Sequence, residues 1–209
     1  QYHEELNYEI SMHVDEQFES HKRTKEVTHN PELAEVEVFI KEGRVDEAIR
    51  ELKIKLSRQP ENLDFNTLCY NLLKDSKDKQ AYLLHAQSYM NVLFKTGKKM
   101  RASQIYHEIL ASNPEFKPLN ADLYLGFIEM WRSQMKFKEA VNLGANFHKT
   151  HPQHPDLVKI YFLLAQILCE NLNNDRSSQQ ILDYLLAEHK QSELYEKINT
   201  YVQVMKKVG

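Results

Sequence analysis

The sequence predicts an all-α protein built as a superhelical array of antiparallel helix hairpins. Among its 209 residues there are only 5 glycines and 6 prolines, so long stretches contain no helix breaker. Within those stretches, apolar residues recur every three or four positions, which is the spacing of a buried helix face. A pattern of glycine, alanine and proline also returns along the chain, and such recurrence is typical of repeated hairpins.

The first hairpin is predicted to turn at Gly43. Glycine readily adopts the left-handed conformation that ends a helix, and Asp46 and Glu47 suit the first turn of the helix that follows. Ala48 comes next, on the inner face, where a small side chain lets the preceding helix approach closely. Pro60 ends the second helix. Two helices joined at Gly43 are therefore expected.

The same pattern appears again further along the chain. A second copy keeps all three residues 54 positions later, as Gly97, Ala102 and Pro114. A third copy keeps two of them another 38 positions on, as Ala140 and Pro152, and has Met135 in place of the glycine. A fourth copy is degenerate: Ser177 is assigned the small-residue position, Ile181 and Leu185 follow at intervals of four, and His189 replaces the proline.

These residues resemble the tetratricopeptide repeat family, a helix-turn-helix unit with a period of about 34 residues. The resemblance covers an array at 31–190 and implies a tetratricopeptide-like α-solenoid. Because the spacings exceed that period, an inserted helix is expected at about 61–80 and a longer loop in the third repeat. The expected helices span 31–42, 45–58, the insert ending near Asp75, 81–95, 98–112, 121–134, 137–149, 155–170, 176–188 and 191–207. Of these, 121–134 carries an aromatic core stripe of Tyr124, Phe127, Ile128 and Trp131.

Two segments flank the predicted array. Residues 1–30 are expected to form an acidic leading helix and a linker, because the first 20 residues carry six acidic side chains and no lysine or arginine. Their apolar stripe, Leu6, Ile10, Val14 and Phe18, needs a surface to cover it, either on the array, on a second copy of the chain, or in a longer helix. Residues 191–209 are expected to form a C-terminal capping helix.

The family resemblance also implies a function. In tetratricopeptide arrays the first helices line a concave groove that binds peptides, which implies a non-catalytic protein-interaction scaffold with a protein or peptide partner. The implied groove residues are Gln87, Asn91, Lys95, Glu129, Arg132 and Gln166. The alternative is a structural or assembly module that self-associates, or lies close to a membrane, through the N-terminal helix.

Other chemistry receives little support from the sequence. His148, His151 and His154 are the best metal candidates, but they straddle a helix end and a proline-broken loop, so no metal site and no cofactor is predicted. The basic run 95–101 is interpreted as a solvated corner. A net charge of −3 gives no general attraction to nucleic acid. Phosphate loops, nucleophile elbows and zinc-protease motifs are all absent from the sequence, which predicts no enzyme.

The cysteines bear on the compartment. Cys69 and Cys169 are far apart, in apolar helical runs, and are expected to be reduced, buried thiols. No apolar run approaches 18 residues, and no signal peptide is visible. A cytoplasmic location is therefore expected. Because the chain starts at Gln1, it is also expected to suit the soluble part of a larger or membrane-anchored protein.

Overall fold

The computed structural model describes residues 30–208, and within that range all regular structure is helical. Neighbouring helices pair as hairpins, which confirms the predicted all-α hairpin array. The described residues divide into two compact units, 30–75 and 76–208. The predicted acidic leading helix, with its stripe of Leu6, Ile10, Val14 and Phe18, lies outside the described residues.

The described part of the first unit is a hairpin followed by one more helix. Its elements are the short 3-10 helix η1 (Pro31–Leu33), α2 (Ala34–Lys41), α3 (Val45–Arg58) and α4 (Leu63–Asp75). Asn30 caps the first turn, because its side chain accepts a hydrogen bond from the backbone N–H of Glu32 at 3.1 Å. The helix α3 packs against both α2 and α4, and it buries Ala48 and Leu52 completely. The inserted helix expected from the sequence ends at Asp75, as α4.

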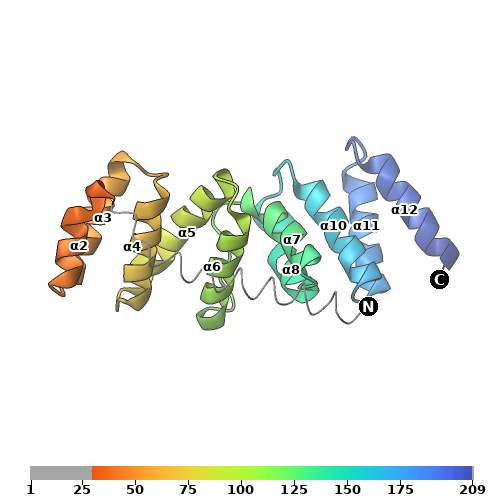
Figure 1. Ribbon diagram of the computed structural model, residues 1–209. Coiled ribbons are helices and arrows are strands. Elements are labelled where there is room, and N and C mark those ends of the chain that lie inside the picture. Colours follow the sequence, from red (N-terminus) through yellow and green to blue (C-terminus); the bar gives the residue numbers. More distant parts are fainter. Residues whose placement is uncertain (1–29, 209) are drawn as a thin grey trace, which may run out of the picture. The chain divides into compact units, whose positions relative to one another are not determined.

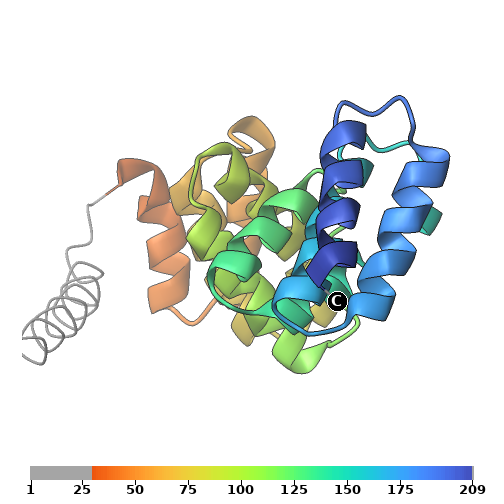
Figure 2. The same cartoon turned by 90° about the vertical axis from the view of Figure 1, so that its right-hand side faces the viewer.

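The second unit contains three hairpins and a closing helix (Figure 1). Its helices are α5 (Lys79–Lys95), α6 (Lys99–Ser112), α7 (Leu123–Ser133), α8 (Phe137–Gly144), α9 (Phe147–Thr150), α10 (Leu157–Glu170), α11 (Asp175–Glu188) and α12 (Tyr195–Val208). The pairs are α5 with α6, α7 with α8, and α10 with α11. Figure 2 shows α12 beside α11 at the C-terminal end, where it buries Ile198 and Val202.

Each hairpin turns at one residue with a positive φ angle. These corner residues are Gly43, Gly97, Met135 and Asn173, with φ between 50° and 75°. At the second corner, the backbone N–H of Lys98 donates to the carbonyl of Leu93 at 2.7 Å. This bond, together with one from Gly97 to Phe94 at 3.1 Å, closes the helix end in a Schellman motif. Met135 therefore takes the backbone conformation of the glycine whose place it occupies.

The fourth repeat corrects the sequence assignment by one position. Ser178, rather than Ser177, occupies the small-residue site: it is completely buried, and its hydroxyl donates to the carbonyl of Ala165 at 2.8 Å. Leu182 is likewise buried, whereas the predicted Ile181 is only partly so. His189 is the C-cap residue of α11, so Lys190 stands in the place of the proline. Without a glycine or a proline, the apolar spacing alone does not determine the register of this helix.

The second helix of the third hairpin is interrupted, contrary to the expected single helix at 137–149. The helix α8 ends at Gly144, and Asn146 has a left-handed φ of 62° before α9 begins. Gly144 lies against α10, where an added Cβ would come within 2.5 Å of a methyl carbon of Leu164. The short α9 instead directs Phe147 into the core, where its side chain is buried. This break positions the histidine-containing loop described below.

Aromatic side chains join the first two hairpins of the second unit. The predicted stripe on α7 is confirmed as core, since Tyr124, Phe127, Ile128 and Trp131 are all buried. The indole N–H of Trp131 donates to the hydroxyl of Ser103 on α6 at 3.1 Å. The ring of Tyr106 packs against both Trp131 and Phe127, with centroids 5.0 and 4.9 Å away. The hairpins are therefore linked by close ring packing and a buried hydrogen bond.

Replacing Gly97 by alanine is expected to destabilise the second unit by about 1 kcal/mol, because a φ of 75° is unfavourable for a residue with a Cβ. The cost comes from the backbone alone, since an added Cβ would meet no atom within 4 Å. Denaturation followed by fluorescence measures this directly, because Trp131 is the only tryptophan in the sequence.

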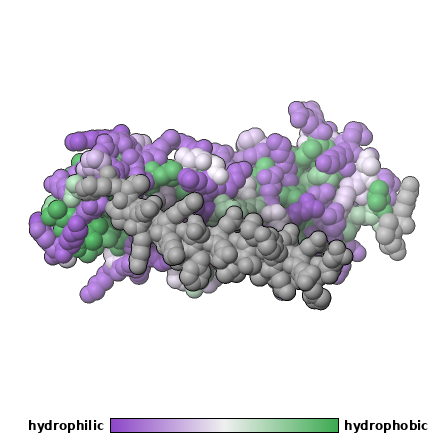
Figure 3. All heavy atoms as spheres, in the orientation of Figure 1, coloured by the Kyte–Doolittle hydropathy of each residue, from purple (hydrophilic) through white to green (hydrophobic). Residues whose placement is uncertain are grey.

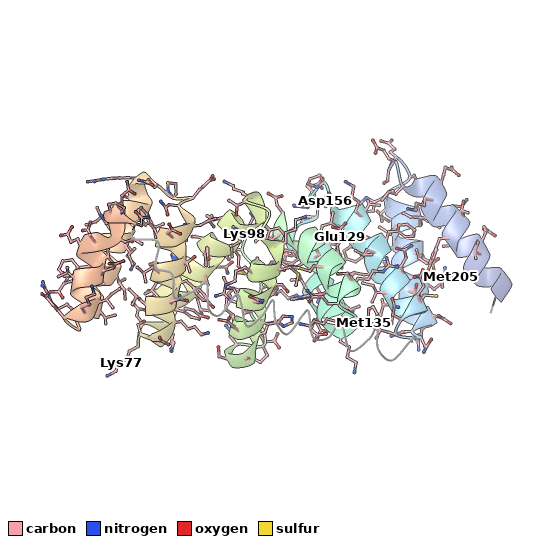
Figure 4. The ribbon with its side chains drawn as sticks, in the orientation of Figure 1. Lys77, Lys98, Glu129, Met135, Asp156 and Met205 are labelled. Carbon is pink, nitrogen blue, oxygen red and sulfur yellow. The ribbon has the colours of Figure 1, made fainter. Side chains whose placement is uncertain are left out.

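Met135→Gly serves as the matched control. The side chain of Met135 points into solvent (Figure 4) and is 77% exposed, so its removal loses no buried contact. Glycine also relieves the positive φ, and we expect no loss of stability. Equal destabilisation by the two substitutions would contradict this account of the corners.

Candidate functional site

The linker between α6 and α7, residues 113–122, lies against α5. The side-chain amide of Gln87 holds it at two points, donating to the carbonyl of Lys117 at 3.4 Å and accepting from the backbone N–H of Leu119 at 3.0 Å. The amide oxygen of Asn91 accepts from the side chain of Asn120 at 3.0 Å. Two of the groove residues predicted from the sequence thus contact the chain's own linker.

Two buried tyrosines also hold this linker. The hydroxyl of Tyr106 donates to the carbonyl of Phe116 at 3.0 Å, and that of Tyr124 donates to the carbonyl of Pro118 at 3.2 Å. Burial raises the pKa of both phenols, so they act as neutral hydrogen-bond donors. The linker is therefore fixed to α5, α6 and α7.

Arg132 and Gln166, two other predicted groove residues, meet in a polar network that spans three helices. Arg132 of α7 donates to the amide oxygen of Gln166 at 3.3 Å and forms an ion pair with Glu170 of α10 at 3.0 Å. The other carboxylate oxygen of Glu170 accepts from the hydroxyl of Tyr201 on α12 at 3.0 Å. Burial and the bond to Glu170 raise the pKa of Tyr201. This arrangement places α7, α10 and α12 on one continuous face, here named the network face.

The last two predicted groove residues are exposed. Lys95 lies at the end of α5, and Glu129 lies on α7 one turn before Arg132 (Figure 4). Within residues 30–205, whose side chains are described, Glu129 has no ion-pair partner. The six predicted residues thus separate into a set that holds the linker, a set in the network, and two exposed charges.

A hollow of about 450 Å³ opens beside the network, between α10 and α12. Its lining residues are Phe162, Gln166, Glu196, Lys197, Thr200, Tyr201 and Val204. The rings of Phe162 and Tyr201 meet edge to face at 5.6 Å, and the ammonium of Lys197 lies 5.8 Å from the centre of the Phe162 ring. Phe162 and Gln166 of this lining are positions that the family resemblance implies on the groove side. Tyr201 belongs to the terminal helix, for which the sequence predicted only a capping role.

Exposed apolar side chains are dispersed over the second unit. In the part of the second unit that Figure 3 leaves uncovered, hydrophobic and hydrophilic side chains are interspersed. The most exposed apolar residues of its helices and linker include Leu84, Met100, Leu119, Met135 and Val204. Of these, Val204 is the one that lines the hollow beside the network.

The three neighbouring histidines have different partners. The imidazole of His148 hydrogen-bonds the hydroxyl of Tyr161. His154 is hydrogen-bonded to Asp122 at 3.0 Å through Nε2, and its Nδ1 accepts from the backbone N–H of Asp156, so Nε2 is the donor. His151 instead packs on the ring of Phe147. Within the described part of the chain, no group of three or more His, Cys, Asp or Glu side chains is arranged to hold a metal ion.

The basic corner between α5 and α6 is partly involved in local contacts. The ammonium of Lys99 lies over the ring of Phe94 at 5.9 Å, and Arg101 forms an ion pair with Glu108 at 3.4 Å. Lys98 is the N-cap residue of α6. These contacts agree with the interpretation of the run as a solvated corner.

His107 occupies an unusual electrostatic position between α6 and α8. Its Nε2 accepts a hydrogen bond from the ammonium of Lys136 at 2.7 Å, and its ring packs on Trp131. Burial, and secondly the charge of Lys136, lower the pKa of this imidazole below its ordinary value of 6.5. The folded chain therefore favours the neutral form of His107.

The lowered pKa of His107 predicts a pH dependence of stability. As the pH falls below about 6.5, the imidazole of His107 becomes protonated in the unfolded chain but stays neutral in the folded chain until a lower pH. The contribution of His107 to the free energy of unfolding is therefore fully present above pH 6.5 and is lost as the pH falls. The variant His107→Gln keeps an acceptor for Lys136 but does not titrate. We expect its free energy of unfolding to fall less than that of the wild type between pH 7.5 and 5. Parallel curves for the two proteins would contradict this.

The ion pair between Arg132 and Glu170 is predicted to contribute little to stability. Both side chains are about one-third exposed or more, and pairs of this kind contribute about 1 kcal/mol or less. A double-mutant cycle with Arg132→Gln and Glu170→Gln measures the coupling by chemical denaturation. A coupling above about 2 kcal/mol would contradict this prediction and would make the network a structural element.

Two further findings concern membrane spanning and the thiols. No helix of the described residues is long and apolar enough to cross a membrane. Cys69 and Cys169 are both free, but Cys169 is only partly buried, contrary to expectation. Burial raises the pKa of the Cys69 thiol to about 11, so this thiol is protonated and unreactive at neutral pH.

The comparisons with known proteins give only remote similarity. No family model matches this chain, and no curated protein matches it. A solved structure described as the crystal structure of MamA protein is 14% identical, over 79% of this chain and 93% of that chain, with a TM-score of 0.37. Another MamA structure is 13% identical, over 82% and 96%, with a TM-score of 0.32. Because these TM-scores are too low to assign a fold, the hairpin fold is assigned from this chain's own helices and corners.

Proposed function

We propose that this protein is a non-catalytic scaffold that binds a segment of a partner protein on the network face of its second unit. The observation that carries the proposal is the network of Arg132, Gln166, Glu170 and Tyr201, which holds polar side chains of three helices on one face. The hollow beside it adds apolar surface. Polar groups around a small apolar recess are typical of protein-binding surfaces.

The rigidity of this face favours binding. Each side chain of the network is held by at least one other, so little conformational entropy remains to be lost when a partner docks. The ion pair is partly exposed and is expected to add little stability, so exchanging it for contacts with a partner would cost little. A face that is ordered without stabilising the fold is suited to recognition.

The proposed surface differs in part from the groove residues predicted from the sequence. We assign direct contact to Glu129, Arg132 and Gln166 on the network face, and a role for Lys95 at the end of α5 stays a prediction. Gln87 and Asn91 are not assigned direct contact, because their side chains hydrogen-bond the chain's own linker. Assembly through residues 1–30 is the other candidate, and it depends on residues outside the described range. Two free cysteines fit a reducing compartment, and we propose the cytoplasm.

Charge reversal at Glu129 tests the proposed surface. Glu129→Lys changes an exposed side chain on the network face and is expected to lower partner capture from native lysate at least tenfold, without loss of helicity. Glu188→Lys, an exposed acidic position at the end of α11, is the matched control and should capture like the wild type. Quantitative mass spectrometry of the retained proteins provides the measurement. Equal capture by all three proteins would refute the proposed surface.

A further inference from the structure

We infer that the acidic segment 1–20 of this chain docks on the exposed side of α3. This surface, here named the α3 face, is formed by four exposed side chains, Arg50, Lys53, Ile54 and Arg58. It lies in the first unit, whereas the network face belongs to the second, so the inference goes beyond the proposed function. Three observations carry it: the charge of the α3 face, the charge of the segment, and the point at which the chain enters the first unit.

The cations of the α3 face have little to neutralise them. Among the described side chains, Lys53 and Arg58 have no hydrogen-bond or ion-pair partner. The guanidinium of Arg50 donates only to a backbone carbonyl of its own helix, at 3.4 Å. The one carboxylate between Arg50 and Arg58 is that of Glu51, and it is already paired with Lys55 at 3.2 Å. The second half of α3 therefore presents three positive charges to solvent.

An exposed apolar side chain lies among these cations. Ile54 is 48% exposed, and Arg50 and Arg58 lie four residues before and after it, so the three share one side of the helix. The opposite side of α3 buries Leu52 completely. A ligand for the α3 face therefore has to combine negative charge with apolar side chains.

The other helices of the first unit do not offer such a surface. The helices α2 and α4 each carry two carboxylates and one lysine, and the remaining carboxylates of α3 lie before Arg50. An acidic segment attached to this unit is therefore attracted to the second half of α3 rather than to α2 or α4.

The sequence of segment 1–20 complements the α3 face. It carries six carboxylates and no lysine or arginine, and apolar residues recur every four positions from Leu6 to Phe18. Glu5 and Glu19 directly adjoin the two ends of this stripe. The segment thus combines apolar side chains with carboxylates, whereas the α3 face combines an apolar side chain with cations. One residue of the stripe can cover Ile54 while neighbouring carboxylates meet the cations around it.

The chain enters the first unit beside the cationic end of α3. Glu32 accepts a hydrogen bond from the side chain of Gln59 at 3.2 Å, and Gln59 directly follows Arg58. The nine residues 21–29 can span about 30 Å when extended, and the 14 residues of α3 extend over about 21 Å. The segment can therefore reach the whole α3 face. Covalent attachment raises its effective concentration to about the millimolar range, so individually weak ion pairs are sufficient.

Carbodiimide cross-linking of the full chain tests this docking, because the reagent joins a lysine amine directly to a carboxylate in contact with it. In an equal mixture of unlabelled and isotope-labelled protein, we expect Lys53 to be joined to a carboxylate of segment 1–20 that carries the same label. Arg50→Glu/Arg58→Glu keeps the amine of Lys53 but reverses the charges on either side of Ile54. This double variant should lower the yield of the product at least fivefold, as measured by quantitative mass spectrometry.

Matched variants separate the α3 face from other surfaces. Ile54→Gln should lower the yield severalfold, whereas Val38→Gln, which changes a side chain of α2 that is 49% exposed, should leave the yield unchanged. Lys98→Glu/Lys138→Glu reverses two exposed cations of the second unit and should also give the wild-type yield. All the substituted side chains are exposed, and circular dichroism checks that each variant is folded.

Four results would overturn the inference. The first is the absence of a product between Lys53 and segment 1–20 in the wild type, and the second is an equal yield from Arg50→Glu/Arg58→Glu. The third is a product whose two peptides carry different labels, because the segment would then dock on a second copy of the chain. The fourth is a yield that falls only with Lys98→Glu/Lys138→Glu. The proposed function is decided separately, by the capture experiment with Glu129→Lys.

Discussion

The structure depends on one residue per hairpin adopting a left-handed backbone conformation. Gly43, Gly97, Met135 and Asn173 each reverse the chain, and the fully buried small residue lies five positions after each of them. Because the spacing between the corner and the small residue is constant, the two helices pack in the same register in each hairpin. The first helices of the second unit then present the same faces, which is why Arg132 of α7 reaches Gln166 and Glu170 of α10.

The linker after α6 covers part of the surface of α5. Between the corners at Gly97 and Met135, residues 113–122 form this linker, and it is hydrogen-bonded to α5. Tyr106 and Tyr124 hold this linker from the core side. Its backbone hydrogen-bonds the amide group of Gln87, so this predicted groove residue is occupied by the chain itself.

The sequence predicts the hairpins well wherever a corner carries glycine and a helix ends at proline. It is less exact where both are missing: the fourth repeat was misplaced by one residue, although Asn173 is a residue type that tolerates a positive φ. The break after Gly144 was not predicted, and the close approach of Gly144 to Leu164 is a tertiary contact that spacing does not reveal. For the site, the hydrogen bond between Arg132 and Gln166 was not predicted, although the family resemblance implied both residues on the groove side. The linker contacts of Gln87 and Asn91 could not be predicted, because the linker path depends on tertiary hydrogen bonds.

The central claim is that a partner segment binds across α7, α10 and α12. Site-directed photo-crosslinking tests it most directly, with a photoreactive amino acid placed at Thr200 of α12 or at Leu84 of α5, both exposed. The account predicts a covalent adduct with a partner protein from Thr200 and none from Leu84. An adduct from Leu84 alone, or from neither position, would contradict it.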